Sequence, residues 1–262
     1  MSVWTAVLRR GLADQRRTIL IWGLALGAMS AFMAAIYPSI QDALAEVVKS
    51  YPKGIIQAFG VGDLNSVEGY IHAEMYSLVI PLSIGYLGVR SMAGPIAAGE
   101  ENGYLDTLLT LPLPRHVLMV GTFVCSCVVS AAVLLITGVL TLTTARIAGT
   151  DLTISDTVAG NAGAWSLSVF AAGVAAAGCG ALHHGRAVIG IGMGTLVAMY
   201  ALDVAGRLSD SVEPLRNVSA FKYYGAPLRD GLYTGGFFLL IGCGALLVGA
   251  GVLLFGRRDV LR

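Results

Sequence analysis

The chain has 262 residues, of which 56% are hydrophobic and 13% charged, and its formal net charge is +1. Its mean hydropathy of +0.75 excludes an ordinary soluble domain and predicts a membrane protein in contact with lipids, without a nucleic-acid partner. Lipid offers backbone amides no hydrogen-bond partners, so each apolar run that is long enough to cross it is expected to be a helix. The predicted fold class is therefore all-α.

Residues 2–13 are predicted to form an amphipathic helix before the first apolar run. At about 100° per residue, its apolar side chains share one half of the helical wheel, and Arg9 and Arg10 fall in the other half. The apolar side chains are those of Val3, Trp4, Val7, Leu8 and Leu12. Such a helix lies in the inner membrane surface. A plain positively charged anchor is the alternative, but it does not explain the grouping of the apolar residues.

Six apolar runs are long enough to cross a hydrocarbon core of about 30 Å. They predict one polytopic domain over residues 1–262, with spans near 18–37, 75–97, 117–144, 161–182, 187–206 and 233–256. The long outer segment, about 38–72, is expected to be interrupted at Pro38. Pro81 and Pro95 each remove an intrahelical hydrogen bond, so the second helix is expected to be kinked.

Two pairs of glycines, each spaced four residues apart, predict close packing between helices. Gly23 and Gly27 lie in the first run, and Gly190 and Gly194 lie in the fifth.

The distribution of basic residues predicts that both termini are cytoplasmic. In that orientation the inner segments carry ten Lys and Arg against five Asp and Glu, and the outer segments carry seven against eleven. The four arginines before the first run and the pair after the last decide this count. We expect a multi-pass protein of a bacterial cell (inner) membrane.

Groups that carry out chemistry are scarce in the apolar runs, which predicts that the chain is not an enzyme. Ion-driven transporters need carboxylates or similar groups near the bilayer midplane, and the runs hold almost none. The histidines show no H-E-x-x-H spacing, and the chain has no G-x-x-x-x-G-K-[ST] loop. We therefore expect no catalytic residue, no metal site and no bound cofactor, and any energy for transport has to come from another chain.

Arg90, in the inner half of the second run, is a candidate for a translocation path together with Tyr86, because a charge within a membrane is costly and is usually retained for function. An arginine this close to the cytoplasmic end can equally extend its guanidinium to the interface. Both readings stay open.

A short amphipathic helix is predicted over about 100–111, on the cytoplasmic side. Its leucines fall on one side of the helical wheel, and Asp106 falls among threonines on the other. Glu100 and Glu101 place negative charge at its start, which the helix dipole favours, and Pro112 ends it. A leucine face in this position packs on the membrane surface or in a groove of a soluble partner.

The order E-E-N-G-Y-L-D-T-L-L-T-L-P-L-P-R resembles the corresponding segment of type-2 ABC exporter permeases, in which an acid, a glycine, a leucine pair and a proline recur after the second span. The helix before the first span, the six spans, the "SAFKYY" segment and the terminal "GRRDV" are also similar to that family. The resemblance therefore covers essentially the whole chain. Ala220 departs from it, because such permeases often have proline before the aromatic residues.

The resemblance implies the permease subunit of an ATP-driven exporter of a hydrophobic or amphipathic small molecule, such as an antibiotic, a drug or a lipid. It implies a second permease, either the same chain or a homologue, and cytoplasmic nucleotide-binding ATPase subunits that hold ATP and Mg2+. The segment 99–112 would dock on the ATPase as a coupling helix. The residues carried over to this role are Glu100, Glu101, Gly103, Leu105, Asp106, Leu108, Leu109 and Pro112.

Three other interpretations remain for the chain and this segment. The segment can be an interfacial loop helix without a partner. The chain can be a polytopic enzyme acting on lipid or peptide, or a non-transporting anchor or sensor subunit that recruits an ATPase.

Overall fold

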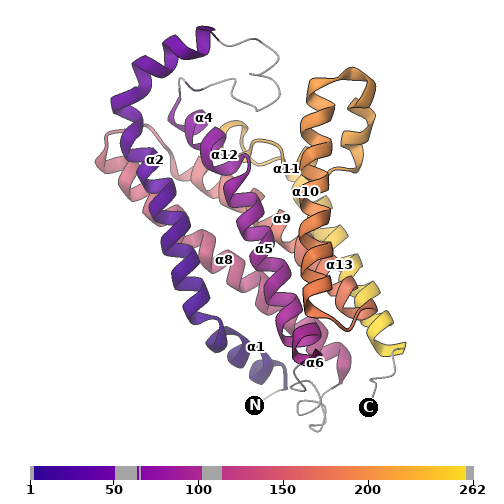
Figure 1. The fold of residues 1–262 in the computed structure, drawn as a ribbon. Coiled ribbons are helices and arrows are strands. Elements are labelled where there is room, and N and C mark those ends of the chain that lie inside the picture. Colours follow the sequence, from indigo (N-terminus) through magenta and orange to yellow (C-terminus); the bar gives the residue numbers. More distant parts are fainter. Residues whose placement is uncertain (1–2, 51–63, 65, 102–113, 258–262) are drawn as a thin grey trace.

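The computed structural model describes residues 3–50, 64, 66–101 and 114–257, and within these ranges it contains helices and no strand (Figure 1). The all-α prediction is confirmed for these residues. The α-helices are α1 (Val3–Asp14), α2 (Arg16–Ser50), α4 (Val67–Ile71), α5 (Val79–Ala93), α6 (Gly99–Glu101), α8 (Arg115–Ile147), α9 (Ile154–Ala181), α10 (Gly185–Leu208), α11 (Ala220–Tyr224), α12 (Pro227–Asp230) and α13 (Thr234–Arg257).

Five helices are long and apolar enough to cross a membrane, namely α2, α8, α9, α10 and α13. The run expected over 75–97 is divided. Its α-helical part, α5, has 15 residues and lies between two π-helical segments, η1 (His72–Tyr76) and η2 (Gly94–Ala98). Pro81 lies in the first turn of α5, where a missing amide costs no intrahelical hydrogen bond, whereas Pro95 lies where α5 continues without a break into the π-helical η2. The count of six spans therefore stays a prediction.

The prediction that the chain is interrupted at Pro38 is wrong, because α2 continues through this residue to Ser50. A proline inside a helix removes one hydrogen bond and clashes with the preceding turn, so the surrounding contacts must compensate. The neighbouring Tyr37 is buried, and its ring packs on that of Tyr70 with centroids 5.5 Å apart.

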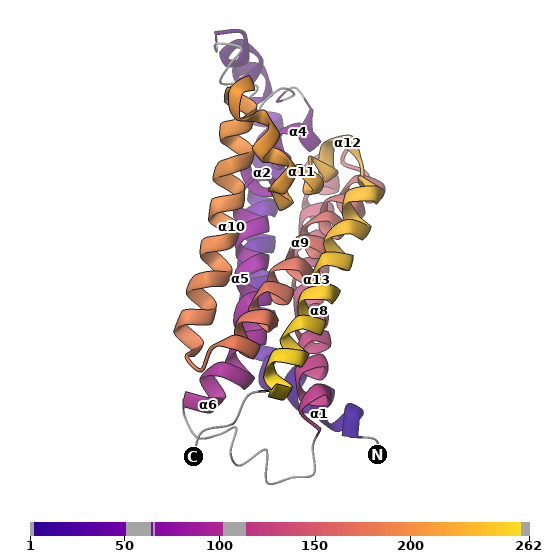
Figure 2. The same cartoon turned by 90° about the vertical axis from the view of Figure 1, so that its right-hand side faces the viewer.

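Helix α9 lies at the centre of the bundle. In its apolar stretch 72% of the residues are buried, against 22% for α10 and for α13. Figure 2 shows α13 beside α9, and glycines explain this close approach. A Cβ atom on Gly173 would lie 2.6 Å from the carbonyl oxygen of Gly244, and one on Gly180 would lie 2.5 Å from that of Gly251. The backbones of α9 and α13 therefore touch at two points.

The two glycine pairs predicted to mediate packing behave differently. Gly23 and Gly27 of α2 face α8, where added Cβ atoms would lie 2.9 Å from Ile136 and 2.6 Å from Leu140. Gly190 and Gly194 of α10 have no heavy atom within 4 Å of such a Cβ. Among the described residues, the second pair therefore lies on an open face of α10, and the prediction that it mediates close packing stays a prediction.

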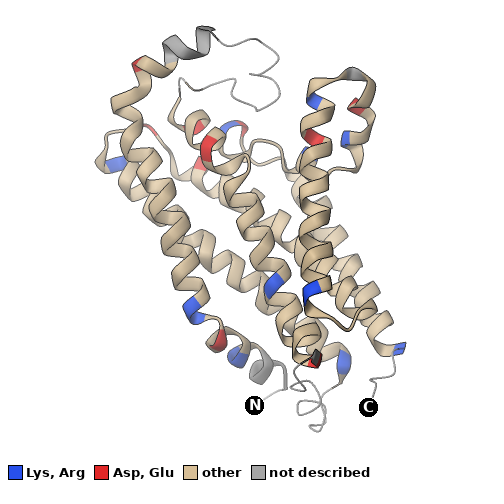
Figure 3. Ribbon diagram, viewed as in Figure 1, with Lys and Arg blue, Asp and Glu red and all other residues tan. Residues whose placement is uncertain are grey.

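Charged residues gather mostly towards the two ends of the bundle, and its middle is apolar (Figure 3). Both described chain ends, α1 and the end of α13, lie at the same end of the bundle (Figure 1). Helix α1 contacts α8 there, at an angle to α2. Gln15, between α1 and α2, accepts a 2.6 Å hydrogen bond from the hydroxyl of Ser91 in α5. We call this end, which the sequence predicts to be cytoplasmic, the inner end and the opposite one the outer end.

Candidate functional site

The first predicted coupling residue, Glu100, is anchored to the turn between α9 and α10. Its carboxylate Oε1 lies 2.8 Å from Nδ1 of His183, and the Glu100 side chain is largely buried. The contact is an ion pair when the imidazole is protonated and a hydrogen bond when it is neutral. Eighty-three positions separate the two residues in the sequence. The end of α6 is therefore connected to the α9–α10 turn.

Backbone packing reinforces this connection. A Cβ atom on Gly185, the first residue of α10, would lie 2.8 Å from the Cβ and 2.9 Å from the backbone nitrogen of Ala98. Seven residues further along α10, a Cβ on Gly192 would lie 2.8 Å from the side chain of Val89 in α5. The inner half of α10 therefore lies directly on η2 and α5. We call the contacts of Glu100 and Ala98 with His183 and Gly185 the inner junction.

The rest of the predicted coupling helix falls largely outside the described residues. The backbone of Glu101 ends α6. Gly103, Leu105, Asp106, Leu108, Leu109 and Pro112 lie outside the described residues, so their roles stay predictions.

The chain is described again from Pro114, and Arg115 begins α8. Arg115 donates a 3.2 Å hydrogen bond to the carbonyl oxygen of Phe255 in α13, and its guanidinium lies 5.7 Å from the centre of the Phe255 ring. The start of α8 is therefore attached to the end of α13. Both flanks of segment 102–113 are thus held by neighbouring helices at the inner end.

The two residues proposed for a translocation path contact each other. Arg90 donates a 3.1 Å hydrogen bond from Nη1 to the hydroxyl of Tyr86, one helical turn earlier in α5. The Tyr86 ring packs on Trp22 of α2, with centroids 5.9 Å apart. The spacing of four residues predicts the first contact, but sequence reasoning missed Trp22 because it lies in another helix. Arg90 is exposed, so its charge lies at the bundle surface.

Within the described ranges, no group of three His, Cys, Asp or Glu side chains is placed to hold a metal ion. The four cysteines are free thiols in the long helices.

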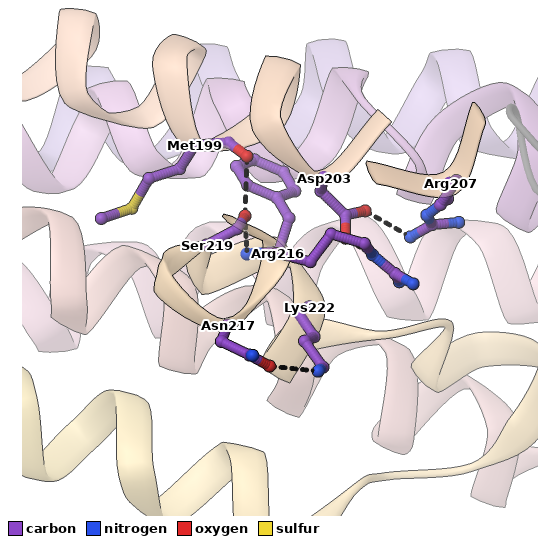
Figure 4. A network of polar contacts seen from close by, with 8 residues as sticks. Met199, Asp203, Arg207, Arg216, Asn217, Ser219 and Lys222 are labelled. Carbon is purple, nitrogen blue, oxygen red and sulfur yellow. Dashed lines mark hydrogen bonds and ion pairs between the residues drawn. The ribbon is translucent and has the colours of Figure 1, made fainter. Parts of the chain in front are cut away.

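An ionic network that sequence reasoning missed closes the outer end (Figure 4). Asp203 of α10 is 2% exposed, and its two carboxylate oxygens lie 2.5 Å from Arg207 and 3.0 Å from Arg216. Arg216 belongs to η3 (Asp210–Val218), a 3₁₀ segment after α10. Ser219 donates a 2.6 Å hydrogen bond back to the carbonyl oxygen of Met199. The chain after α10 is therefore folded back onto that helix.

The "SAFKYY" segment, where Ala220 departs from the pattern of the resembling permeases, forms α11 and is capped by Ser219. Ala220, Phe221 and Tyr224 are buried. The Tyr224 hydroxyl donates a 2.8 Å hydrogen bond to the carbonyl oxygen of Tyr76. This segment therefore connects the outer end of α10 to η1.

Comparison with known families identifies the class of this architecture. Residues 11–256 match the family described as multidrug efflux system permease Rv1217c, C-terminal domain. A search of curated proteins gave no match. The matched range extends from α1 to the last turn of α13 and includes every helix of spanning length and both flanks of segment 102–113. The chain is a multi-pass membrane protein, and it belongs to the family of the multidrug efflux system permease Rv1217c, C-terminal domain.

Proposed function

We propose that the chain is the membrane subunit of an ATP-driven exporter that moves a hydrophobic or amphipathic small molecule, such as an antibiotic, a drug or a lipid, out of the cell. The observation that carries this proposal is the family match over residues 11–256. The chain supplies the path, a second permease completes it, and cytoplasmic ATPases bind ATP and Mg2+ and supply the energy. In this proposal the chain crosses the membrane six times, with η1, α5 and η2 as the second crossing, and both termini lie in the cytoplasm.

In this proposal, segment 100–111 docks on the ATPase and transmits its movement. The residues in contact with the ATPase are Glu100, Glu101, Gly103, Leu105, Asp106, Leu108, Leu109 and Pro112. Movement of this segment reaches α5 through η2 and α8 through Arg115. It also reaches α10 through the inner junction, because Glu100 and Ala98 contact the α9–α10 turn.

We place the second permease against α10, because one face of this helix is open. Gly190, Gly194, Ile191 and Val197 are exposed on this helix, although it is apolar enough to span the membrane. Small residues let helices of two chains approach closely. Arg90, Tyr86 and Trp22 line the proposed translocation path, where aromatic rings and one guanidinium suit an amphipathic cargo.

The decisive experiment is affinity purification of the full chain in mild detergent. We expect a nucleotide-binding protein to co-purify in equal amount, and the purified pair in vesicles to accumulate a fluorescent drug only with ATP and Mg2+. Turnover of a lipid or peptide by the chain alone, without ATP, would favour the enzyme. Stoichiometric ATPase capture without drug accumulation would favour the anchor or sensor subunit.

Leu108→Asp tests the coupling segment in the same vesicles. It places a charge in an apolar contact, so we expect drug accumulation per ATP hydrolysed to fall at least about tenfold. The matched control is Thr107→Asp, which adds the same charge on the predicted polar side. Equal transport by both variants and the unmodified chain would contradict the assignment of this segment.

A further inference from the structure

A small polar cavity lies at the outer end, between α10 and the segments that cover it. It is lined by His72, Ser77, Tyr200, Asp203, Arg207 and Tyr224, and its volume is about 30 Å3. One water molecule needs about 10–15 Å3 of such space, so the cavity holds about two waters or one small ion. It is too small for a drug or a lipid, and it is separate from Arg90, which lies in the inner half of the membrane.

Two polar atoms of this wall are buried and have no hydrogen-bond partner, Nδ1 of His72 and Nε of Arg207. His72 as a whole is only 5% exposed. A guanidinium Nε always donates, and the Nδ1 of an imidazole donates when it carries the proton. A buried donor without a partner is unfavourable because nothing replaces its lost hydration. The Nε–H of Arg207 therefore calls for an acceptor inside the cavity, and the same acceptor can pair with His72 in the tautomer that carries the proton on Nδ1.

The charges around the cavity favour a negatively charged acceptor. Asp203 is shared by Arg207 and Arg216, which leaves this cluster with one excess positive charge. Arg229 and Asp230 pair with each other at 2.6 Å and add no net charge. Water neutralises none of the excess charge, whereas a monovalent anion neutralises all of it.

We propose that this cavity binds one small monovalent anion of the halide class, held by Arg207 and by the Nδ1–H of His72. The anion bridges α10 to η1, the first turns of the second membrane segment, and so fixes the outer end of α10. This role is independent of the cargo and of the ATPase. Asp203 keeps its ion pairs with Arg207 and Arg216. The anion accepts hydrogen bonds only from donors that these pairs do not use.

The test is the thermal stability of the purified full chain in mild detergent, with chloride exchanged for gluconate at constant ionic strength. Unfolding is followed by the reaction of the four native thiols with a fluorogenic reagent. We expect the midpoint to rise saturably with chloride and with bromide, but not with gluconate. Identical midpoints in chloride and gluconate would show that water alone fills the cavity and would overturn the proposal.

Two variants assign the effect to this site. His72→Phe removes the donor and retains a planar ring, so the chloride-dependent shift should disappear, whereas His72→Gln retains an N–H donor and should retain part of the shift. Arg146→Gln, at an exposed arginine near the outer end of α8, should retain all of it. An unchanged shift in His72→Phe would overturn the proposal. If that variant does not fold, chloride NMR of the unmodified protein tests the site instead. We expect the protein to broaden the chloride line and bromide to reverse this broadening by competing for the site. The absence of broadening would overturn the proposal.

Discussion

Replacing Asp203 by asparagine tests how much the outer ionic network stabilises the protein. The substitution retains the shape of the side chain and removes the charge that Arg207 and Arg216 share. Breaking a fully buried pair costs about 3–5 kcal/mol, and an exposed pair contributes about 0–1 kcal/mol. Asp203 is 2% exposed, but the arginine side chains are 29% and 23% exposed, so we expect a loss of about 2–3 kcal/mol between these limits.

The assay is thermal unfolding in detergent, where this loss corresponds to a midpoint lowered by about 4–12 °C for a chain of this size. Asp151→Asn, at an exposed carboxylate of the outer end, is the matched control and should not change the midpoint. Adding Arg207→Gln to Asp203→Asn removes one uncompensated charge and should restore part of the loss. An unfolding midpoint of Asp203→Asn within error of the control would refute the reasoning.

The remaining predictions concern the inner junction and the helix contacts. His183→Ala removes the partner of Glu100, so drug accumulation per ATP should fall severalfold with ATPase binding unchanged; His184→Ala, at the exposed neighbour, should transport normally. Gly244→Ala places a Cβ 2.8 Å from a carbonyl oxygen of α9 and should lower stability by about 1–3 kcal/mol, whereas Gly249→Ala, with open space around it, should be neutral when unfolding is measured.

Hydropathy predicted the long helices because lipid leaves the backbone no other way to satisfy its hydrogen bonds. It did not predict the division of the second run, since a π-helical segment changes the backbone pattern without changing the composition. Helix α2 continues through Pro38 because neighbouring residues pack on other helices, as Tyr37 does on Tyr70. Rules based on local sequence cannot predict such long-range contacts.

The sequence did not predict which residues of the candidate site contact each other when they lie on different helices. The spacing of four residues makes Asp203–Arg207 and Tyr86–Arg90 predictable, because both lie on one helix face. Glu100 and His183, in contrast, are 83 positions apart and meet only because α10 packs on η2. Glycine spacing likewise predicted that Gly190 and Gly194 favour close approach, but not that their face of α10 is open.

The two contacts between glycines of α9 and α13 limit how this protein can change shape. Backbones that touch at Gly173–Gly244 and Gly180–Gly251 leave no room for a side chain at either point, so a rotation that brought one between the helices would have to separate them. These two helices should behave as one rigid body. Shear and tilting are therefore left to α2, α8 and α10, whose motions are best measured relative to this fixed pair.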